Sequence, residues 1–220
     1  MSVVKCVLFD CDGTLVDSEK LCCEAIVTTF EQVGVSLSLD AVSDNFSGGK
    51  IADVLSSAQD LAKSHVSLDL LEPIYREETK RLFEEKLRPI EGVMSLLHYL
   101  DEQGIEYCVV TNGPVSKAEK MLSIVGLADK FTGKIISAFD ANSWKPEPDL
   151  LQYSVTIMGF LPTECLYVDD TVKGVRMGVS AGLRTIHFAT SCDYEQRNAT
   201  CLTSMEQVID YINEQNNSAL

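Results

Sequence analysis

The chain begins with an apolar run, Val3-Val4-Lys5-Cys6-Val7-Leu8-Phe9, and continues at once with Asp10-Cys11-Asp12-Gly13-Thr14. The apolar run predicts a buried strand. Because residues two apart on an extended chain point to the same side, Asp10 and Asp12 emerge together at the strand's carboxyl end. Gly13 then allows the chain to turn. Two such acids are typical of a hard-cation site with one acid left for nucleophilic or acid–base chemistry, although Asp and Gly are also ordinary turn formers.

Beyond this stretch, short apolar runs alternate with helical patterns. Further strands are predicted over Ile105–Val110, Gly133–Ala138, Cys165–Val168 and Arg184–Phe188. Helices are predicted over Val93–Glu102, Ser116–Val125, Leu150–Met158, Val172–Ala181 and Ser204–Asn213. This alternation predicts an α/β fold with a doubly wound parallel sheet, in which ligands bind at the carboxyl edge of the strands.

One long segment departs from the alternation. Between Glu19 and Lys86 the sequence has no convincing strand, and its apolar residues have helical spacing. We therefore expect an inserted α-helical cap domain over residues 18–87, covering the carboxyl edge of a core formed by 1–17 and 88–220. The alternative, in which these helices merely flank the sheet, fits less well with so long a stretch without a strand.

Charge limits the classes of partner. The chain of 220 residues carries 18 Lys and Arg against 33 Asp and Glu, a formal net charge of −15. So acidic a protein is not expected to bind nucleic acid or an anionic membrane, although a local site can still bind a small anion. No pattern indicates an obligate protein partner.

The cysteines and the N-terminal sequence indicate the cellular compartment of the protein. None of the eight cysteines forms a C-x-x-C pair, and several lie in apolar runs, which predicts buried free thiols in a reducing compartment. The sequence shows no signal-peptide pattern before the first strand and no apolar segment of membrane-spanning length. We therefore expect a cytoplasmic protein.

Three more motifs follow the predicted strands. Thr111-Asn112-Gly113 supplies a hydroxyl, an amide and a backbone N–H suited to phosphate oxygens, although an Asn-Gly turn is the simpler interpretation. Lys145, held between Trp144 and Pro146, can neutralise an anion or hold carboxylates, or be a surface lysine. Asp169-Asp170 again brings acids to a strand end, where they can bind a cation or cap a helix.

The four motifs, taken in order, resemble a known family. The stretch from Phe9 to Glu19, Phe9-Asp10-Cys11-Asp12-Gly13-Thr14-Leu15-Val16-Asp17-Ser18-Glu19, resembles the first motif of the haloacid dehalogenase-like hydrolase superfamily. Thr111-Asn112, Lys145 and Asp169-Asp170 match its second, third and fourth motifs. The resemblance implies a Mg²⁺-dependent phosphatase that hydrolyses a small phosphorylated metabolite, such as the sugar phosphate 6-phosphogluconate, through an aspartyl-phosphate.

The resemblance also implies a role for each acid. Asp10 is the expected nucleophile, and Asp12 the acid and base that serves the leaving oxygen and then water. Mg²⁺ would be held by Asp10, the backbone carbonyl of Asp12, and Asp170. Asp169 either holds the metal through water or orients Lys145.

Substrate contacts are expected from both domains. The resemblance implies that Thr111, the Asn112 backbone and Lys145 stabilise the transferring phosphoryl group. In the cap, the loop Ser47-Gly48-Gly49-Lys50 resembles the family's substrate-facing loop, so Gly49 and Lys50 are candidate substrate-binding residues. A solvated lysine at the start of a helix is the alternative for Lys50.

Two other functions remain open at this point. Sugar phosphomutases of the β-phosphoglucomutase type resemble the chain but carry a His after the first motif, where this sequence has Cys22-Cys23. A non-catalytic binder of phosphorylated ligands, or a phospho-accepting regulator, would be indicated by Mg²⁺ binding without release of phosphate from any ester.

Overall fold

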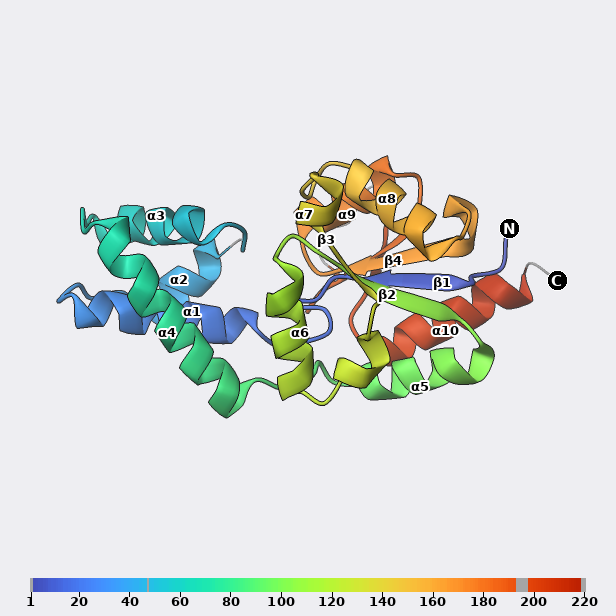
Figure 1. The fold of residues 1–220 in the computed structure, drawn as a ribbon, viewed down its shortest axis with the longest axis horizontal. Helices are drawn as coiled ribbons and strands as arrows, with labels where there is room; N and C mark the ends of the chain where they lie inside the picture. Colours follow the sequence, from blue (N-terminus) through green and yellow to red (C-terminus); the bar gives the residue numbers. More distant parts are fainter. Residues whose placement is uncertain (1, 47, 193–197, 219–220) are drawn as a thin grey trace. The chain divides into compact units, whose positions relative to one another are not determined.

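The computed structural model describes residues 2–46, 48–192 and 198–218 of the chain (Figure 1). These residues form two compact units, one of 1–16 with 89–220 and the other of 17–88. The predicted domain limits lie one residue from this division at each junction. That the second unit acts as a cap stays a prediction.

The first unit contains a six-stranded parallel sheet in the order β3-β2-β1-β4-β5-β6. Its strands are β1 Cys6–Phe9, β2 Glu106–Thr111, β3 Ile135–Ser137, β4 Cys165–Asp169, β5 Arg184–Phe188 and β6 Thr200–Leu202. The last residue of the central strand β1, Phe9, pairs with Val109 on β2 and with Val168 on β4, close to the carboxyl ends of both neighbours. The residues after these positions therefore meet at one edge of the sheet, which confirms the predicted doubly wound α/β fold.

Helices cover both faces of this sheet. They are α5 Val93–Gln103, α6 Val115–Ile124, α7 Ala138–Ala141, α8 Asp149–Met158, α9 Val172–Ser180 and α10 Met205–Asn217, with 3-10 turns at Ala128–Phe131 and Pro162–Glu164. In Figure 1, α5 and α10 lie side by side on one face, and α8 and α9 lie on the other. Both faces are thus buried, which explains why the strands are near-continuous apolar runs.

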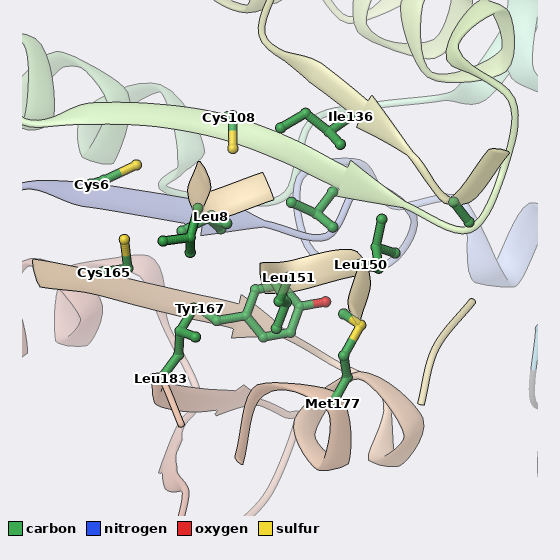
Figure 2. Packing of buried hydrophobic residues seen from close by; sticks show 13 residues of the cluster. Cys6, Leu8, Cys108, Ile136, Leu150, Leu151, Cys165, Tyr167, Met177 and Leu183 are labelled. Carbon is green, nitrogen blue, oxygen red and sulfur yellow. The ribbon is translucent and has the colours of Figure 1, made fainter. Parts of the chain in front are cut away.

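The side chains of β1 alternate between the two faces of the sheet. Cys6 and Leu8 on β1 point into a cluster that includes Leu151 of α8 and Met177 of α9 (Figure 2). The intervening Val7 and Phe9 are equally buried, and by alternation they face the opposite side of the sheet. This packing fixes the end of β1 and hence the position of Asp10.

The second unit is helical throughout the residues described for it. Its helices are α1 Glu19–Gln32, α2 Leu39–Asn45, α3 Ile51–Ala62 and α4 Leu68–Lys86. The helix α1 packs along α4, with Phe30 and Leu71 among the fully buried residues. As predicted, the described part of this segment has no strand. Across the described residues of the whole chain, no helix combines the length and apolar character needed to cross a membrane.

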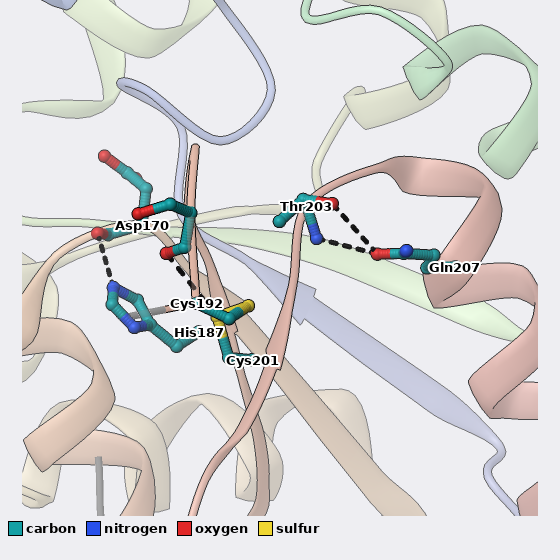
Figure 3. The surroundings of a disulfide bond; sticks show 7 residues. Asp170, His187, Cys192, Cys201, Thr203 and Gln207 are labelled. Atoms are coloured by element: carbon teal, nitrogen blue, oxygen red, sulfur yellow. Dashed lines mark hydrogen bonds between the residues drawn. A yellow bond between two sulfur atoms is a disulfide. The ribbon is translucent and has the colours of Figure 1, made fainter. Parts of the chain in front are cut away.

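Two features correct the sequence-based predictions. The edge strand β6 was not predicted, because it has three residues and none of them is fully buried. Cys192 and Cys201 form a disulfide (Figure 3), so the prediction of free thiols is wrong for this pair. Cys201 lies on β6, which pairs with β5, and Cys192 lies beyond the end of β5, so the two cysteines are nine residues apart and belong to no short motif. Six other cysteines are free and buried.

Candidate active site

The first acidic motif is built by the end of β1. The backbone N–H of Asp10 donates to the carbonyl of Val168 at 2.9 Å, which continues the pairing with β4 one residue beyond the strand. Gly13 has a φ of +77°, in the left-handed region that favours glycine. A Cβ on Gly13 would lie 2.2 Å from Oδ2 of Asp170. Gly13 therefore both turns the chain and lets the first motif approach the fourth.

Lys145 lies at the centre of the site. Its Nζ is 2.7 Å from Oδ1 of Asp10 and 2.7 Å from Oδ2 of Asp169, and only 5% of its side chain is exposed. Its backbone N–H donates to Oδ1 of Asn112 at 2.9 Å, so the second motif holds the third in place. Buried charges are tolerated when they are paired, and this lysine is paired with two carboxylates.

Burial governs the protonation of these groups. Burial raises the pKa of Asp10 to about 7, against the opposing attraction of Lys145 and with added repulsion from Asp169. Burial alone would lower the pKa of Lys145, but Asp10 and Asp169 outweigh it and raise that pKa. Lys145 is therefore a permanent cation at neutral pH. Burial also raises the pKa of the Cys11 thiol well above its ordinary value, so this cysteine stays protonated between the two acids.

The two acids of the fourth motif have different surroundings. Both oxygens of Asp169 accept hydrogen bonds. Oδ2 accepts from Lys145 at 2.7 Å and from the Tyr167 hydroxyl, and Oδ1 accepts from the backbone N–H and the hydroxyl of Thr171, both at 2.7 Å. Asp170 accepts at Oδ1 from the Thr14 hydroxyl at 2.6 Å. Asp169 is completely buried, whereas Asp170 is partly exposed. The surroundings of Asp169 are those of a carboxylate that orients Lys145.

The acids suit a divalent cation. Asp10, Asp169 and Asp170 each offer a carboxylate oxygen, and these oxygens lie within 4.8 Å of one another. Hard oxygen donors of this kind fit Mg²⁺, which binds through one or two carboxylates and keeps several waters. Since both oxygens of Asp169 already accept from protein donors, Asp10 and Asp170 are the better direct ligands.

The second motif supplies donors near the same edge. The Thr111 hydroxyl accepts from the N–H of Gly113 at 3.0 Å, and so keeps its own proton for a ligand. The Asn112 side-chain oxygen is occupied by Lys145, which leaves the phosphate role to its backbone, as the resemblance implies.

Gly49 and Lys50, the predicted substrate-binding residues, belong to the second unit. Gly49 has a φ of +110°, and Lys50 is the exposed N-cap residue of α3. Ser47, in the same loop, lies outside the described residues. The predicted substrate contacts of Gly49 and Lys50 stay predictions.

Three residues near the motifs were not singled out from the sequence. Lys117 on α6 pairs with both oxygens of Asp12, at 3.0 and 2.8 Å. Tyr167 contacts Asp169, and Nε2 of His187 lies 3.2 Å from the backbone oxygen of Asp170 (Figure 3). Lys117 could have been found from its sequence position. It lies in the first turn of the helix that directly follows the second motif, and that helix begins at the sheet edge where the motifs meet.

Comparisons with known proteins identify the family of the chain. Residues 7–188 match the model of a family described as haloacid dehalogenase-like hydrolase. The chain is 36% identical to 6-phosphogluconate phosphatase of Escherichia coli (strain K12), over 86% of this chain and 84% of that protein. It is 30% identical to hexitol phosphatase A of the same organism, over 91% of each.

A solved structure shares the fold. A HAD family hydrolase from Deinococcus radiodurans R1, with bound phosphate and sodium, has a TM-score of 0.80 and 22% identity, covering 98% of this chain and 97% of that chain. At that level of identity the likeness concerns the fold alone.

Proposed function

The chain belongs to the haloacid dehalogenase-like hydrolase family and is a phosphatase, and we propose that it hydrolyses a small sugar phosphate through an aspartyl-phosphate on Asp10, with Mg²⁺ as cofactor. The observation that carries the proposal is the buried group Asp10–Lys145–Asp169 at the carboxyl end of β1. A buried carboxylate beside a permanent cation is suited to attack an anionic phosphoryl group, because the lysine reduces the repulsion between the two anions.

The first half of the reaction forms the intermediate. A carboxylate oxygen of Asp10 attacks phosphorus, and the bond from phosphorus to the ester oxygen breaks. Asp12, in its protonated form, gives its proton to the departing alkoxide, which leaves as an alcohol. Lys145, the Thr111 hydroxyl and the Asn112 backbone N–H stabilise the charge on the transferring group.

The second half restores the enzyme. Asp12, now ionised, takes a proton from water as that water attacks phosphorus. The acyl phosphate bond then breaks, inorganic phosphate leaves, and Asp10 returns to its carboxylate form. Asp169 orients Lys145 in both halves, since its own oxygens are fixed by Thr171 and Tyr167.

The arrangement of the acids supports the proposed Mg²⁺ site. Asp10, Asp170 and the backbone carbonyl of Asp12 would hold the ion, with Asp169 behind Lys145. When bound, Mg²⁺ would neutralise part of the negative charge of the phosphoryl group and of the acids. Without it, Lys145 alone would have to offset Asp10, Asp169, Asp170 and the incoming phosphate.

The substrate class rests on the relatives. One is a 6-phosphogluconate phosphatase and another a hexitol phosphatase, both named for phosphorylated open-chain sugar derivatives. We propose the same chemical class here, with 6-phosphogluconate as the first candidate and with Gly49 and Lys50 in contact with the part of the substrate remote from phosphate. An exposed lysine is suited to a sugar hydroxyl or carboxylate.

The test is the release of inorganic phosphate from a panel of esters. The panel includes 6-phosphogluconate, a hexitol phosphate, glucose 6-phosphate, a nucleoside monophosphate and p-nitrophenyl phosphate, each with Mg²⁺ and with chelator. Asp10→Asn is the inactive variant, and Asp101→Asn, which alters an aspartate paired with Lys130 at 2.6 Å, is the matched control.

We expect the highest kcat/KM with 6-phosphogluconate, loss of activity in Asp10→Asn and with chelator, and full activity in Asp101→Asn. Activity on other esters alone would replace the substrate but keep the mechanism. Conversion of β-glucose 1-phosphate to glucose 6-phosphate would favour a mutase, and Mg²⁺ binding without turnover of any ester would favour a binder.

A further inference from the structure

Tyr167 is a polar residue in the middle of an apolar core. It lies on β4 and is completely buried among Leu151, Met177 and other apolar side chains (Figure 2). Its hydroxyl donates to Oδ2 of Asp169, and Nζ of Lys145 lies 5.9 Å from the centre of its ring. One side chain thus contacts both the carboxylate that orients the lysine and the lysine itself.

Packing alone does not require the hydroxyl. Gly178 of α9 makes room for Thr185 and for the ring of Tyr167, since a Cβ there would lie 2.4 Å from Oγ1 of Thr185 and 2.9 Å from Cδ1 of Tyr167. Phenylalanine would fill the same space without bringing a polar atom into the core, which costs free energy unless that atom is hydrogen-bonded. Within the described residues, the hydroxyl therefore serves the carboxylate of Asp169, to which it donates.

The hydroxyl also completes the set of donors around Asp169. Thr171 fixes Oδ1 through two hydrogen bonds, so Lys145 and Tyr167 are the donors that share Oδ2. Without the Tyr167 hydroxyl, Lys145 is the donor that remains at Oδ2 of Asp169. The carboxylate oxygen then attracts the lysine more strongly, because it no longer shares its negative charge with a second donor. The ammonium would then be drawn toward Asp169 and away from Asp10 and the phosphoryl group.

We propose that Tyr167 is a positioning residue of the phosphatase, which fixes the carboxylate of Asp169 and, through it, the place of Lys145 beside Asp10. This inference rests on the proposed function of the site. It assigns to Tyr167 no contact with substrate and no transfer of a proton.

The chain offers a closely matched control. Tyr107 lies on β2, which is separated from β4 by β1, and only 3% of it is exposed. Its hydroxyl donates to Oδ1 of Asp101 at 2.9 Å, and Nζ of Lys134 lies 4.8 Å from its ring centre. It therefore makes the same two kinds of contact as Tyr167, but with residues outside the four motifs.

The experiment compares Tyr167→Phe with Tyr107→Phe in the full-length protein. Thermal unfolding measures the structural cost, and p-nitrophenyl phosphate hydrolysis gives kcat and KM. The Mg²⁺ activation constant reports the metal site, and inhibition by orthovanadate, an analogue of the transferring phosphoryl group, reports the placement of Lys145.

Each variant loses one hydrogen bond to a carboxylate, and the unfolding temperature should fall further in Tyr167→Phe, because Asp169 is completely buried whereas the Asp101 side chain is 39% exposed. Only Tyr167→Phe should lower kcat, by about tenfold, with a similar weakening of vanadate inhibition, because small displacements of a charged group in an active site are costly. Its Mg²⁺ activation constant should change less than kcat, since the carboxylate of Asp170 is held by the Thr14 hydroxyl and not by Lys145.

Two results would overturn the inference while leaving the proposed function in place. One is wild-type kcat and vanadate inhibition in Tyr167→Phe, and the other is an equal loss of kcat in both variants. A wild-type protein without phosphatase activity on any ester would instead overturn the proposed function, and this inference with it.

Discussion

Asp10→Asn should make the metal-free protein more stable at alkaline pH, although it should abolish catalysis. Burial raises the pKa of Asp10 from 3.8 to about 7. Between these values the folded state holds a proton that the unfolded state has lost, so the stability of the wild type falls as pH rises through this window. At about 1.4 kcal/mol for each pH unit, the cost above pH 7 is on the order of 4 kcal/mol. Asparagine carries no charge and avoids this cost.

The assay is urea unfolding in the presence of chelator at several values between pH 3.5 and pH 8.5, a range that begins below the ordinary pKa of an aspartate. The stability difference between Asp10→Asn and wild type should be small at the acidic end, grow with pH, and level off above pH 7. Asp101→Asn is the control with the opposite sign, because the hydrogen bond from Lys130 lowers the pKa of Asp101. That substitution should remove a small stabilisation that is present at neutral pH and fades in acid. A difference for Asp10→Asn that did not grow with pH, or a variant less stable than wild type at pH 8, would refute the reasoning.

Three further substitutions test separate parts of the site. Lys117→Met breaks a partly exposed ion pair with Asp12, so the free energy of unfolding should change by less than about 1 kcal/mol. Because Asp12 is the proposed acid and base, kcat should fall several-fold in a steady-state assay. An unchanged kcat would count against a role of Lys117 in holding Asp12. Gly174→Ala places a Cβ 1.8 Å from Oδ2 of Asp169, so kcat/KM should fall by about 100-fold, and a fully active variant would contradict the orienting role of Asp169. Lys50→Ala should raise KM for the preferred sugar phosphate more than for p-nitrophenyl phosphate, and equal effects would exclude a part in specificity.

The fold and most motif positions could be predicted because the first, second and fourth motifs stand at the ends of buried strands, whereas Lys145 follows β3 only after the short helix α7. In a parallel sheet the carboxyl ends of neighbouring strands meet, so Asp10, Thr111 and Asp169 were bound to share an edge once the strands were identified. The edge strand β6 could not be predicted in this way, because three half-buried residues give no clear hydrophobic pattern. The disulfide escaped prediction for the related reason that it depends on that strand.

The contacts made by the motif residues were harder to predict from the sequence than the positions of the motifs. Lys117 is 105 residues from Asp12, and a lysine on a helix ordinarily faces solvent. Tyr167 fitted the pattern of a core strand, and nothing in that pattern indicates where a tyrosine hydroxyl points. The sequence also left two roles open for Asp169, and the contacts with Lys145, Tyr167 and Thr171 favour the orienting one.

The most direct test of the account is to trap the covalent intermediate. The enzyme would be mixed with Mg²⁺ and its preferred substrate, quenched in acid within the first turnover, and treated with borohydride, which reduces an acyl phosphate to an alcohol. We expect peptide mass spectrometry to find homoserine in place of aspartate at position 10, and no such change in Asp10→Asn. Reduction at another acid, or active turnover without any reducible intermediate, would contradict the assignment of Asp10 as the nucleophile.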